Sequence, residues 1–521
     1  MLKTEKIEKA AQVNRVELFR FGTALLFIVG IMLFATLQTE SGTDGVLLVA
    51  AAMIGGYIAM NIGANDVANN VGPAVGSHAI TLVGAILIAA TFEAGGALIA
   101  GGDVVGTVKK GIIDPDLVGD RDTFIWLMMA ALLAGAIWLN IATFVGAPVS
   151  TTHSIVGGVL GAGIAAGGWS IADWNQMGMI ASSWVISPLL GGLIAAVFLY
   201  TIKRTITYRR DVLSSANRMV PILVAVMAWA FATYLMVKGL TKLVQVSFPV
   251  ACLIGLVAGG IVYLLLRPLI ARQTSRLENH KSSVNDLFTV PLIFAAALLS
   301  FAHGANDVAN AVGPLAGITE AITGGVVATE AAIPLWVLAV GAIGISLGLA
   351  LYGPKLIRTV GSEITELDKL RAYCIAMAAA ITVIIASQLG LPVSTTHTAV
   401  GGVFGVGFLR EYIKSSYAKT LEEIRDHHAD ADPEAVDRFL AKFEAADVME
   451  KGEMLRNLKA QSTNKRVLSK RDRRGLGRVH RVELVKRNLL LKIAAAWVIT
   501  VPVAGGLAAM FFFMIRGMML P

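Results

Sequence analysis

Two stretches of acid and amide residues interrupt long apolar runs in this sequence. The first, Gly63–Pro73, reads GANDVANNVGP, and the second, Gly304–Pro314, reads GANDVANAVGP. A carboxylate and its neighbouring carboxamides are costly in a hydrocarbon-spanning helix, so such residues indicate a functional site by default. A lone copy could be a structural hydrogen-bond pair between helices, but the near-complete duplication of the motif favours a binding site that occurs in two copies.

The oxygens of these two stretches are ligands of the kind that hard cations prefer. Asn65 and Asn69 lie four residues apart and share a helix face, with Asp66 on an adjacent face. The two copies give room for two small cations or protons, and we expect Asp66 toward the cytoplasmic side and Asp307 toward the external side. The candidate ligands of this coupling cation are Asn65, Asp66, Asn69, Asn306, Asp307 and Asn310.

A second duplicated motif supplies hydroxyl groups. The hexapeptide PVSTTH occupies 148–153 and again 392–397, and a Gly-rich apolar run follows each copy. Pro followed by Ser and Thr is typical of a capped helix N-terminus, where free N–H groups and the helix dipole favour an anion. We expect the two termini to face each other across one tetrahedral oxyanion, whose charge the cations would offset. The candidate anion ligands are Ser150, Thr151, Thr152, Ser394, Thr395 and Thr396.

Three further ionisable residues are candidates for accessory roles. His153 and His397 end the two hexapeptides and could hold the caps, shuttle protons or simply pack. Glu93 is an acid inside an apolar run, yet the corresponding stretch at 344–346 has no carboxylate. This asymmetry favours gating or helix packing by Glu93 over direct ligation. Asp426, His427 and His428 lie in a charged segment and are interpreted as solvated, so no metal beyond the coupling cation and no cofactor is expected.

The composition is that of a membrane protein. Of 521 residues, 55% are hydrophobic and only 15% are charged, and many apolar runs approach the ~20 residues that span a bilayer. The net charge of +8 lies in the connections between these runs, so it indicates topology and not a nucleic-acid partner. The two cysteines, Cys252 and Cys374, fall in apolar runs and show neither a disulfide framework nor metal-ligand spacing.

The apolar runs predict an all-α, polytopic fold of about twelve to thirteen segments. Two short ones, 152–168 and 396–409, could be limbs of re-entrant hairpins. The thirteen runs are 19–37, 46–64, 79–101, 124–147, 152–168, 178–202, 219–239, 248–270, 288–304, 334–352, 372–391, 396–409 and 489–515.

The basic residues orient the chain in a cell membrane. If the N-terminus is cytoplasmic, the loops assigned to the inside carry nearly all Lys and Arg, whereas the loop 102–123, assigned to the outside, is acidic. The assigned inside loops are the N-terminal arm, 203–218, 271–287, 353–371 and 410–488.

The two motif pairs lie in halves that this topology inverts relative to each other. The match extends to 184–192 and 497–506, so the last apolar run belongs to the second repeat. Interrupted helices in inverted repeats indicate a transporter with a site between the halves. The predicted organisation is an arm and extra span (1–43), repeat 1 (44–202), connecting spans (203–287), repeat 2 (288–409), a cytoplasmic insertion (410–488) and the last span (489–521).

GANDVAN twice and PVSTTH twice resemble the signatures of the inorganic phosphate transporter (PiT) family. The resemblance covers about 44–409 and the final span. It implies a non-enzymatic symporter that imports inorganic phosphate with sodium or protons. It also implies cation ligation by Asp66, Asn69, Asp307 and Asn310, and phosphate ligation by the two Ser-Thr-Thr clusters. The run at 19–37 and the insertion 410–488 depart from the family pattern. The resemblance does not decide between a monomer and a homo-oligomer.

Three other functions fit part of the pattern. A sulfate permease of the same fold would use the same hydroxyl clusters, because sulfate is also a tetrahedral oxyanion. A membrane-embedded metal-dependent hydrolase is disfavoured because its site would distinguish a nucleophile from a base, whereas these residues occur as equivalent pairs. A passive anion channel is less favoured still, because the embedded acids would repel its ion.

Overall fold

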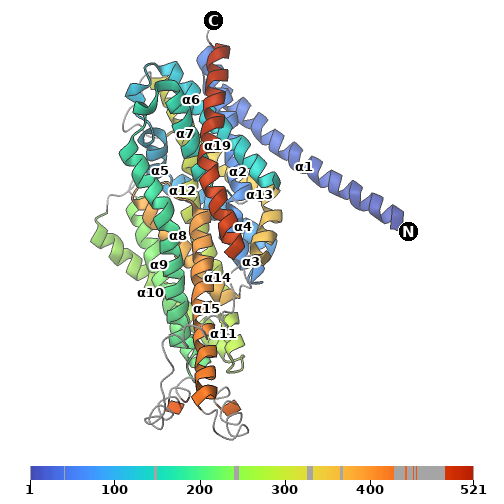
Figure 1. The fold of residues 1–521 in the computed structure, drawn as a ribbon, viewed down its shortest axis with the longest axis vertical. Helices are drawn as coiled ribbons and strands as arrows, with labels where there is room; N and C mark the ends of the chain where they lie inside the picture. Colours follow the sequence, from blue (N-terminus) through green and yellow to red (C-terminus); the bar gives the residue numbers. More distant parts are fainter. Residues whose placement is uncertain are drawn as a thin grey trace.

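A computed structural model shows a bundle of long helices, and no β-strand occurs in the part of the chain that it describes (Figure 1). The described residues are 2–39, 42–145, 149–239, 246–324, 333–363, 368–427, 441–442, 450, 453–454 and 487–519.

Every predicted apolar run overlaps a long helix, and several helices extend well past their run at one end. Their bounds are α1 Leu2–Thr36, α2 Thr43–Asn65, α3 Val67–Gly76, α4 Leu82–Ala100, α6 Arg121–Val145, α7 Thr151–Gly167, α8 Trp174–Ile202, α9 Val212–Tyr234, α10 Phe248–Thr274, α12 Thr289–Gly324, α13 Leu335–Glu363, α14 Lys369–Gln388, α15 Thr395–His427 and α19 Arg487–Met519. The short ones are α5 Gly102–Gly106, η1 Thr107–Gly111, η2 Pro115–Leu117, η3 Trp169–Ile171, η4 Lys203–Thr207, η5 Leu235–Gly239 and α11 Lys281–Leu287.

Each of the thirteen predicted runs contributes a helix, so the all-α, polytopic prediction is confirmed. Among the described residues, eleven helices are long and apolar enough to cross a membrane. The two runs outside that set are the ones expected to be short: α7 has only 17 residues, and α15 carries charges along its second half.

Side-chain caps fix where several of these helices begin. The hydroxyl of Thr81 accepts from the N–H of Gly84 at the start of α4, and the carboxylate of Asp173 accepts from Asn175 and Gln176 at the start of α8. Asp368 caps α14 in the same way through Arg371 N–H. Each cap satisfies N–H groups that the helix itself leaves unpaired.

The helices of the two halves pack against one another in matching pairs. α2 packs on α13 as α12 packs on α4, and α7 packs on α19 as α15 packs on α8. The first glycine of each acid motif makes one such contact possible, because a Cβ at Gly63 would meet the backbone oxygen of Ile345 and one at Gly304 would meet that of Glu93. Small residues of this kind let membrane helices approach closely.

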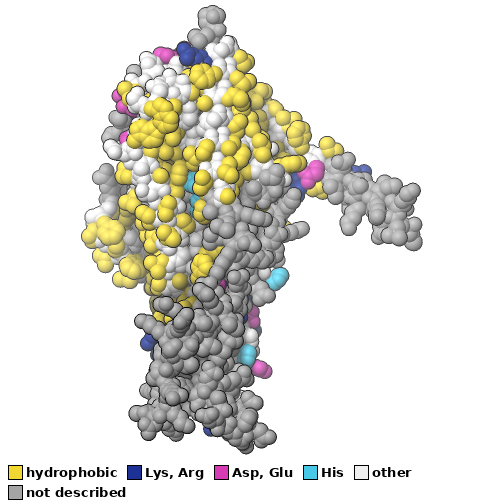
Figure 2. All heavy atoms as spheres, viewed as in Figure 1, with side chains coloured by type: hydrophobic (Ala, Val, Ile, Leu, Met, Phe, Trp, Pro, Cys, Tyr) yellow, Lys and Arg dark blue, Asp and Glu magenta, His cyan; other side chains and the backbone are white. Residues whose placement is uncertain are grey.

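The outer faces of the bundle are apolar. Leu189 and Leu193 on α8, Leu256 on α10 and Val498 on α19 are all more than half exposed. On the face seen in Figure 2, hydrophobic side chains cover a broad zone of the upper body. Such a surface suits contact with lipid and would be unfavourable in water.

Two helices lie at the margin of the bundle. α1 contacts α2 and α13 near its C-terminal end and tilts away from the body toward its N-terminus, as Figure 1 shows. α10 packs mainly on α9, and together they form a hairpin beside the main bundle.

The hydrophilic insertion begins inside a helix. α15 continues through the predicted boundary at 409 and ends at His427. Residues 435–443, whose apolar side chains are spaced as in a helix, lie almost wholly outside the described residues, and His428 lies outside them as well.

Candidate functional site

The first acid motif sits at a break between two helices. α2 ends at Asn65 and α3 starts at Val67, which leaves Asp66 at the junction. The second motif lies in the middle of α12, which continues without a break from Thr289 to Gly324. All six predicted cation ligands are buried in the bundle.

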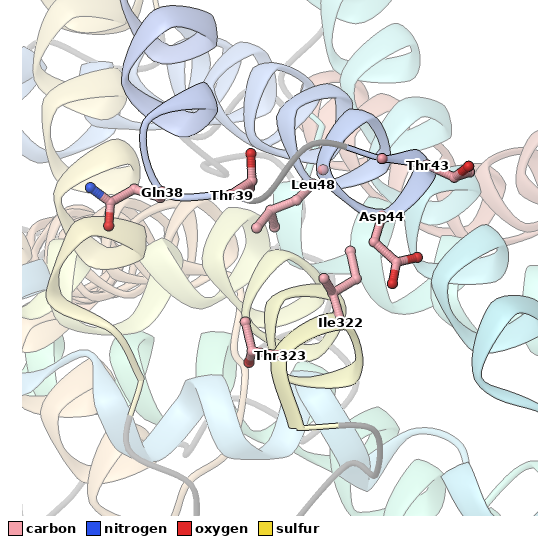
Figure 3. A pocket seen from close by; sticks show the side chains of 9 residues that line it. Gln38, Thr39, Thr43, Asp44, Leu48, Ile322 and Thr323 are labelled. Carbon is pink, nitrogen blue, oxygen red and sulfur yellow. The ribbon is translucent and has the colours of Figure 1, made fainter.

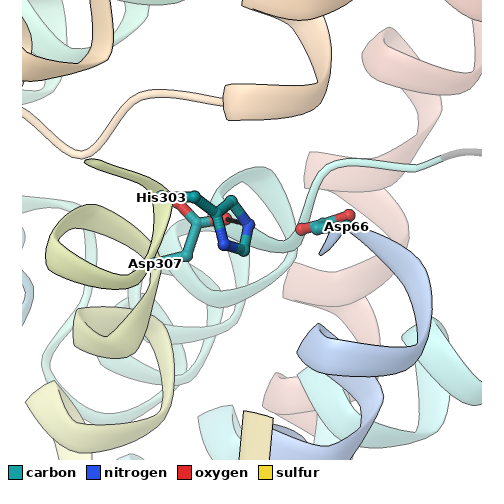
Figure 4. Close-up of side chains that lie close together, drawn as sticks. All are labelled: Asp66, His303 and Asp307. Carbon is teal, nitrogen blue, oxygen red and sulfur yellow. Dashed lines mark ion pairs between the residues drawn. The ribbon is translucent and has the colours of Figure 1, made fainter. Parts of the chain in front are cut away.

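The two acids of the motifs meet in one cluster. A carboxylate oxygen of Asp66, a ring nitrogen of His303 and a carboxylate oxygen of Asp307 all lie within 4.8 Å of one another. Figure 4 shows Asp66 at the end of α2, facing His303 and Asp307 on α12. The expectation that Asp66 and Asp307 occupy separate sites toward opposite sides is therefore wrong, because the packing of α2 and α12 brings both motifs to the same place.

His303 is a residue of this cluster that the sequence reasoning missed. Its Nε2 lies 2.9 Å from Asp307 Oδ2, and its Nδ1 lies 2.6 Å from Glu93 Oε2. Two signals could have found it: it is an ionisable residue inside an apolar run, and it stands four residues before Asp307 on the same helix face.

Glu93 belongs to this network as a supporting group. Its Oε1 accepts a 2.8 Å hydrogen bond from Asn70 Nδ2, and its side chain is fully buried. It thereby joins α3, α4 and α12 and holds the imidazole of His303 beside Asp307. The contacts of Gly304 with Glu93 and of Gly63 with Ile345 make Ile345 the residue of α13 that corresponds to Glu93, and the next residue, Ser346, donates to the backbone oxygen of Ala90.

The two hydroxyl motifs form capped helix N-termini, as predicted. Ser150 Oγ accepts from His153 N–H at 3.2 Å where α7 begins, and Ser394 Oγ accepts from His397 N–H at the same distance where α15 begins. All six predicted anion ligands are buried, with exposed fractions of at most 2%. The free N–H groups of both termini therefore lie inside the protein, where they favour an anion.

Hydroxyls from both termini reach the acid cluster. Thr151 donates to Asp66 Oδ2 at 2.5 Å, Thr395 donates to Asp307 Oδ2 at 3.3 Å, and Thr396 donates to Asp66 Oδ1 at 3.3 Å. Thr396 belongs to the second half and Asp66 to the first, so this last bond crosses between the halves.

Two hydrogen bonds donated by amide side chains also join the two halves, one from each half to the other. Asn69 Nδ2 donates to Thr396 Oγ1 at 2.9 Å, and Asn310 Nδ2 donates to Thr152 Oγ1 at 3.3 Å. Each amide thus bonds the hydroxyl cluster of the opposite half. The candidate anion and cation ligands form one continuous polar site.

Four oxygens of this site are buried without a hydrogen-bond partner among the described residues. They are Asn65 Oδ1, Asn70 Oδ1, Asn310 Oδ1 and Asp307 Oδ1. A buried acceptor without a donor is unfavourable by about 1–3 kcal/mol. A small cation would satisfy such oxygens, which are its usual ligands.

Asn306 has a structural role in the same region. Its Nδ2 donates to Ser387 Oγ and to the backbone oxygen of Leu391, and its Oδ1 accepts from Val393 N–H. These bonds hold the chain that leads into α15, so Asn306 positions the hydroxyl cluster.

His153 and His397 lie behind the hydroxyl clusters and pack against aromatic rings. The His153 ring is 3.9 Å from that of Trp184, the His397 ring is 3.6 Å from that of Trp497, and the two imidazoles are 4.5 Å apart between centroids. Their ring nitrogens have no hydrogen-bond partner among the described residues. This arrangement favours packing over a role in capping.

A cavity of about 710 Å³ lies away from this site, between the α1–α2 connection and the end of α12. Asp44, Leu48 and Thr323 are among the residues that line it (Figure 3). Its lining includes none of the predicted ligands, so it is separate from the polar site.

Comparisons with known proteins agree on one family. A family model described as "Phosphate transporter family" matches residues 62–508. A Helicobacter pylori (strain J99) protein named "Putative phosphate permease" is 51% identical over 518 residues, which are 98% of this chain and 97% of that protein. A Pyrococcus abyssi phosphate permease relative is 38% identical over 363 residues, 70% of this chain and 89% of that protein.

One solved structure matches in fold and in sequence. It is described as "The sodium-dependent phosphate transporter", and it superposes with a TM-score of 0.74 at 30% identity over 91% of this chain and 100% of that chain.

Proposed function

Because this chain belongs to the phosphate transporter family, we propose that it imports inorganic phosphate across the cell membrane by symport with a monovalent cation, sodium or a proton. Phosphate transport is the shared function of the family. The coupling to a cation, the direction and the residues that carry both ions are our proposal. No enzymatic step and no cofactor is needed.

The observation that carries the proposal is the contact between the two kinds of ligand. Thr151 at the start of α7 and Thr396 at the start of α15 both donate to Asp66, while Thr395 donates to Asp307. Hydroxyls and helix N-termini that suit phosphate are therefore directly joined to carboxylates that suit a cation. We assign phosphate to Ser150, Thr151, Thr152, Ser394, Thr395 and Thr396.

Electrostatics at this contact explains why the two ions would bind together. If Asp66 and Asp307 are both ionised at no more than 4.8 Å, they repel each other by at least about 3 kcal/mol at an effective dielectric constant of about 20. A protonated His303 offsets part of this repulsion from 2.9 Å beside Asp307, but Glu93 shares the same imidazole. A cation between Asp66 and Asp307 removes the rest and competes for the carboxylate oxygens. The threonine hydroxyls are then free to turn toward phosphate, whose charge the cation offsets.

The cation would take its remaining ligands from the carboxamides. Asn65, Asn310 and Asp307 each offer a buried oxygen without a partner among the described residues, and Asn69 lies beside them. A site of this kind suits Na⁺, and the name of the 30% identical solved structure supports sodium.

The deciding experiment is phosphate uptake into proteoliposomes under an imposed sodium gradient or an imposed proton gradient. We expect labelled phosphate to accumulate above equilibrium only when one of these gradients is directed inward. Uptake that merely equilibrates under both gradients would contradict symport. Sulfate that accumulates in place of phosphate would identify the alternative substrate.

The orientation is proposed from the basic connections, with the N-terminus and the 410–488 insertion in the cytoplasm. The inverted relation of the halves is proposed with it, and the matching helix pairs support it. Single-cysteine labelling from outside should reach residues near 115 and not those near 210. External labelling near 210 would reverse the topology.

A further inference from the structure

A chamber of about 540 Å³ lies in the wedge where α1 separates from the bundle. Its inner wall is built by α2, α6 and α13, and its outer wall by the segment of α1 from Glu17 to Ile28. Figure 1 shows α1 departing from the body toward its N-terminus. The chamber is distinct from the cavity in Figure 3, which lies at the other end of α1.

The inner wall of the chamber is mostly apolar but carries a strip of polar side chains, Asn61, Asn140 and Thr143. Asn140 on α6 is exposed in the chamber and donates to Asn61 Oδ1 on α2 at 3.3 Å. Thr143, one turn further along α6, also lines the chamber. Amide and hydroxyl groups that face hydrocarbon are unfavourable, whereas water satisfies them. The volume has room for more than about ten waters at ~30 Å³ each.

This polar strip reaches the proposed transport site. Thr143 Oγ1 accepts a 2.9 Å hydrogen bond from Asn65 Nδ2, and Asn65 is the neighbour of Asp66. Ala64, on the other side of Asn65, lines the chamber too. One side-chain hydrogen bond therefore separates the chamber from the predicted cation ligands.

The part of the chamber nearest the N-terminus of α1 carries a balanced pair of charges. Arg20 Nη1 and Glu17 Oε1 are 2.7 Å apart, and both residues line the chamber at the N-terminal end of the apolar part of α1. Charges of one sign here would repel either the anion or the cation, whereas a neutral pair repels neither. In the proposed topology this end of α1 lies on the cytoplasmic side.

We propose that this chamber is a water-filled cytoplasmic vestibule through which phosphate and its coupling cation pass between the polar site and the cytoplasm, with α1 as its outer wall. The inference rests on the proposed function and adds the route and the segment that bounds it. A vestibule beside a closed site is what alternating access requires on the side from which the ions leave.

The test compares two neighbouring positions of α1 in full-length protein whose own cysteines are replaced (Cys252→Ala and Cys374→Ala). Ala24 lines the chamber, whereas Leu26 does not and is 73% exposed on the outer surface. The two positions differ in depth by only about 3 Å of helix rise. Ala24→Cys is the probe and Leu26→Cys is its matched control.

A hydrophilic, membrane-impermeant thiol reagent is then applied to the cytoplasmic side of inside-out vesicles. We expect Ala24→Cys to react at least about tenfold faster than Leu26→Cys, because the reactive thiolate forms in water and not in lipid. Equal rates would show that α1 does not divide the chamber from lipid. An unreactive Ala24→Cys would show that the chamber is dry or filled by a lipid chain, and either result overturns the proposal.

Transport supplies a second readout that a packing role would not produce. After reaction at Ala24→Cys, an anionic or a cationic adduct should each slow coupled phosphate flux about two- to fivefold more than a neutral adduct of similar size, because each charge repels one of the two ions that share the route. Equal slowing by charged and neutral adducts would overturn the route. Phosphate uptake by the unaltered protein is measured first: if it fails, the proposed function fails. Uptake by the cysteine-free parent together with an unreactive Ala24→Cys rejects the vestibule alone.

Discussion

Replacing Thr151 by Val tests whether the two hydroxyl clusters bind one phosphate together. Val keeps the size of Thr but cannot donate the hydrogen bond that Thr151 makes to Asp66 at 2.5 Å in this structure. In the phosphate-bound state the same hydroxyl would donate to the anion. Thr395→Val is the twin change in the second half, where the hydroxyl donates to Asp307 at 3.3 Å.

The size of the effect follows from the charge of the acceptor. A hydrogen bond to a charged group contributes roughly 1.5–3 kcal/mol, so either change should weaken phosphate binding about ten- to a hundredfold. Thr398→Val is the matched control, because Thr398 lies one turn further along α15 and its hydroxyl donates only to the backbone oxygen of Ser394 at 2.9 Å. We expect it to leave the affinity within about twofold.

The assay is equilibrium binding of phosphate to purified protein at saturating cation, with thermal unfolding measured beside it. Arsenate should compete and chloride should not, because only arsenate shares the tetrahedral shape and charge of phosphate. A loss confined to one half, or two independent phosphates per chain, would refute the shared site. An equal loss in Thr398→Val would show that the threonines act through helix stability instead.

Three further outcomes follow from the same geometry. Asp66→Asn and Asp307→Asn should each remove most cation-coupled uptake from folded protein, since each deletes one charge of a cluster whose ligand atoms lie within 4.8 Å of one another. Wild-type cation dependence of uptake in either variant would show that its carboxylate is structural. Glu93→Gln and His303→Gln should each lower the thermal stability, because removing one partner of a buried ion pair costs about 3–5 kcal/mol. The double variant should lose less than the sum, since Glu93 is then no longer left as an unpaired charge, although Asp307 still loses its contact with His303. Strict additivity would argue against a charged Glu93–His303 pair. Deleting 428–486 and joining α15 to α19 by a flexible linker should retain uptake, because all predicted ligands lie outside it, and an inactive but well-folded deletion would reject this.

The family resemblance and the class of protein were accessible from the sequence because they depend on local patterns. Apolar runs predict membrane-spanning helices, and a Ser that follows Pro predicts a capped helix N-terminus. The structure has both predicted caps, at Ser150 and Ser394. The ligand types followed from the duplicated motifs. Their residue roles stay predictions, since neither the fold nor the comparisons test which ion each residue binds.

Distances between distant segments could not be obtained in this way. The duplication of the acid motif suggested two cation sites, yet the packing of α2 and α12 brings Asp66 and Asp307 together. His303 gained its significance only when Glu93, 210 residues away in sequence, was placed against it. A single sequence does not directly show which helices contact each other.

The sequence by itself therefore determined the helices, their caps and the chemical types of the candidate ligands, since these depend on neighbours within a few residues along the chain. The tertiary structure alone decided that Thr396 of one half donates to Asp66 of the other, and that α1 leaves a chamber beside Asn65 whose inner wall carries a polar strip. The physical reason is close packing: where glycines such as Gly63 and Gly304 let helices approach, the contact surfaces of whole helices fix which side chains meet.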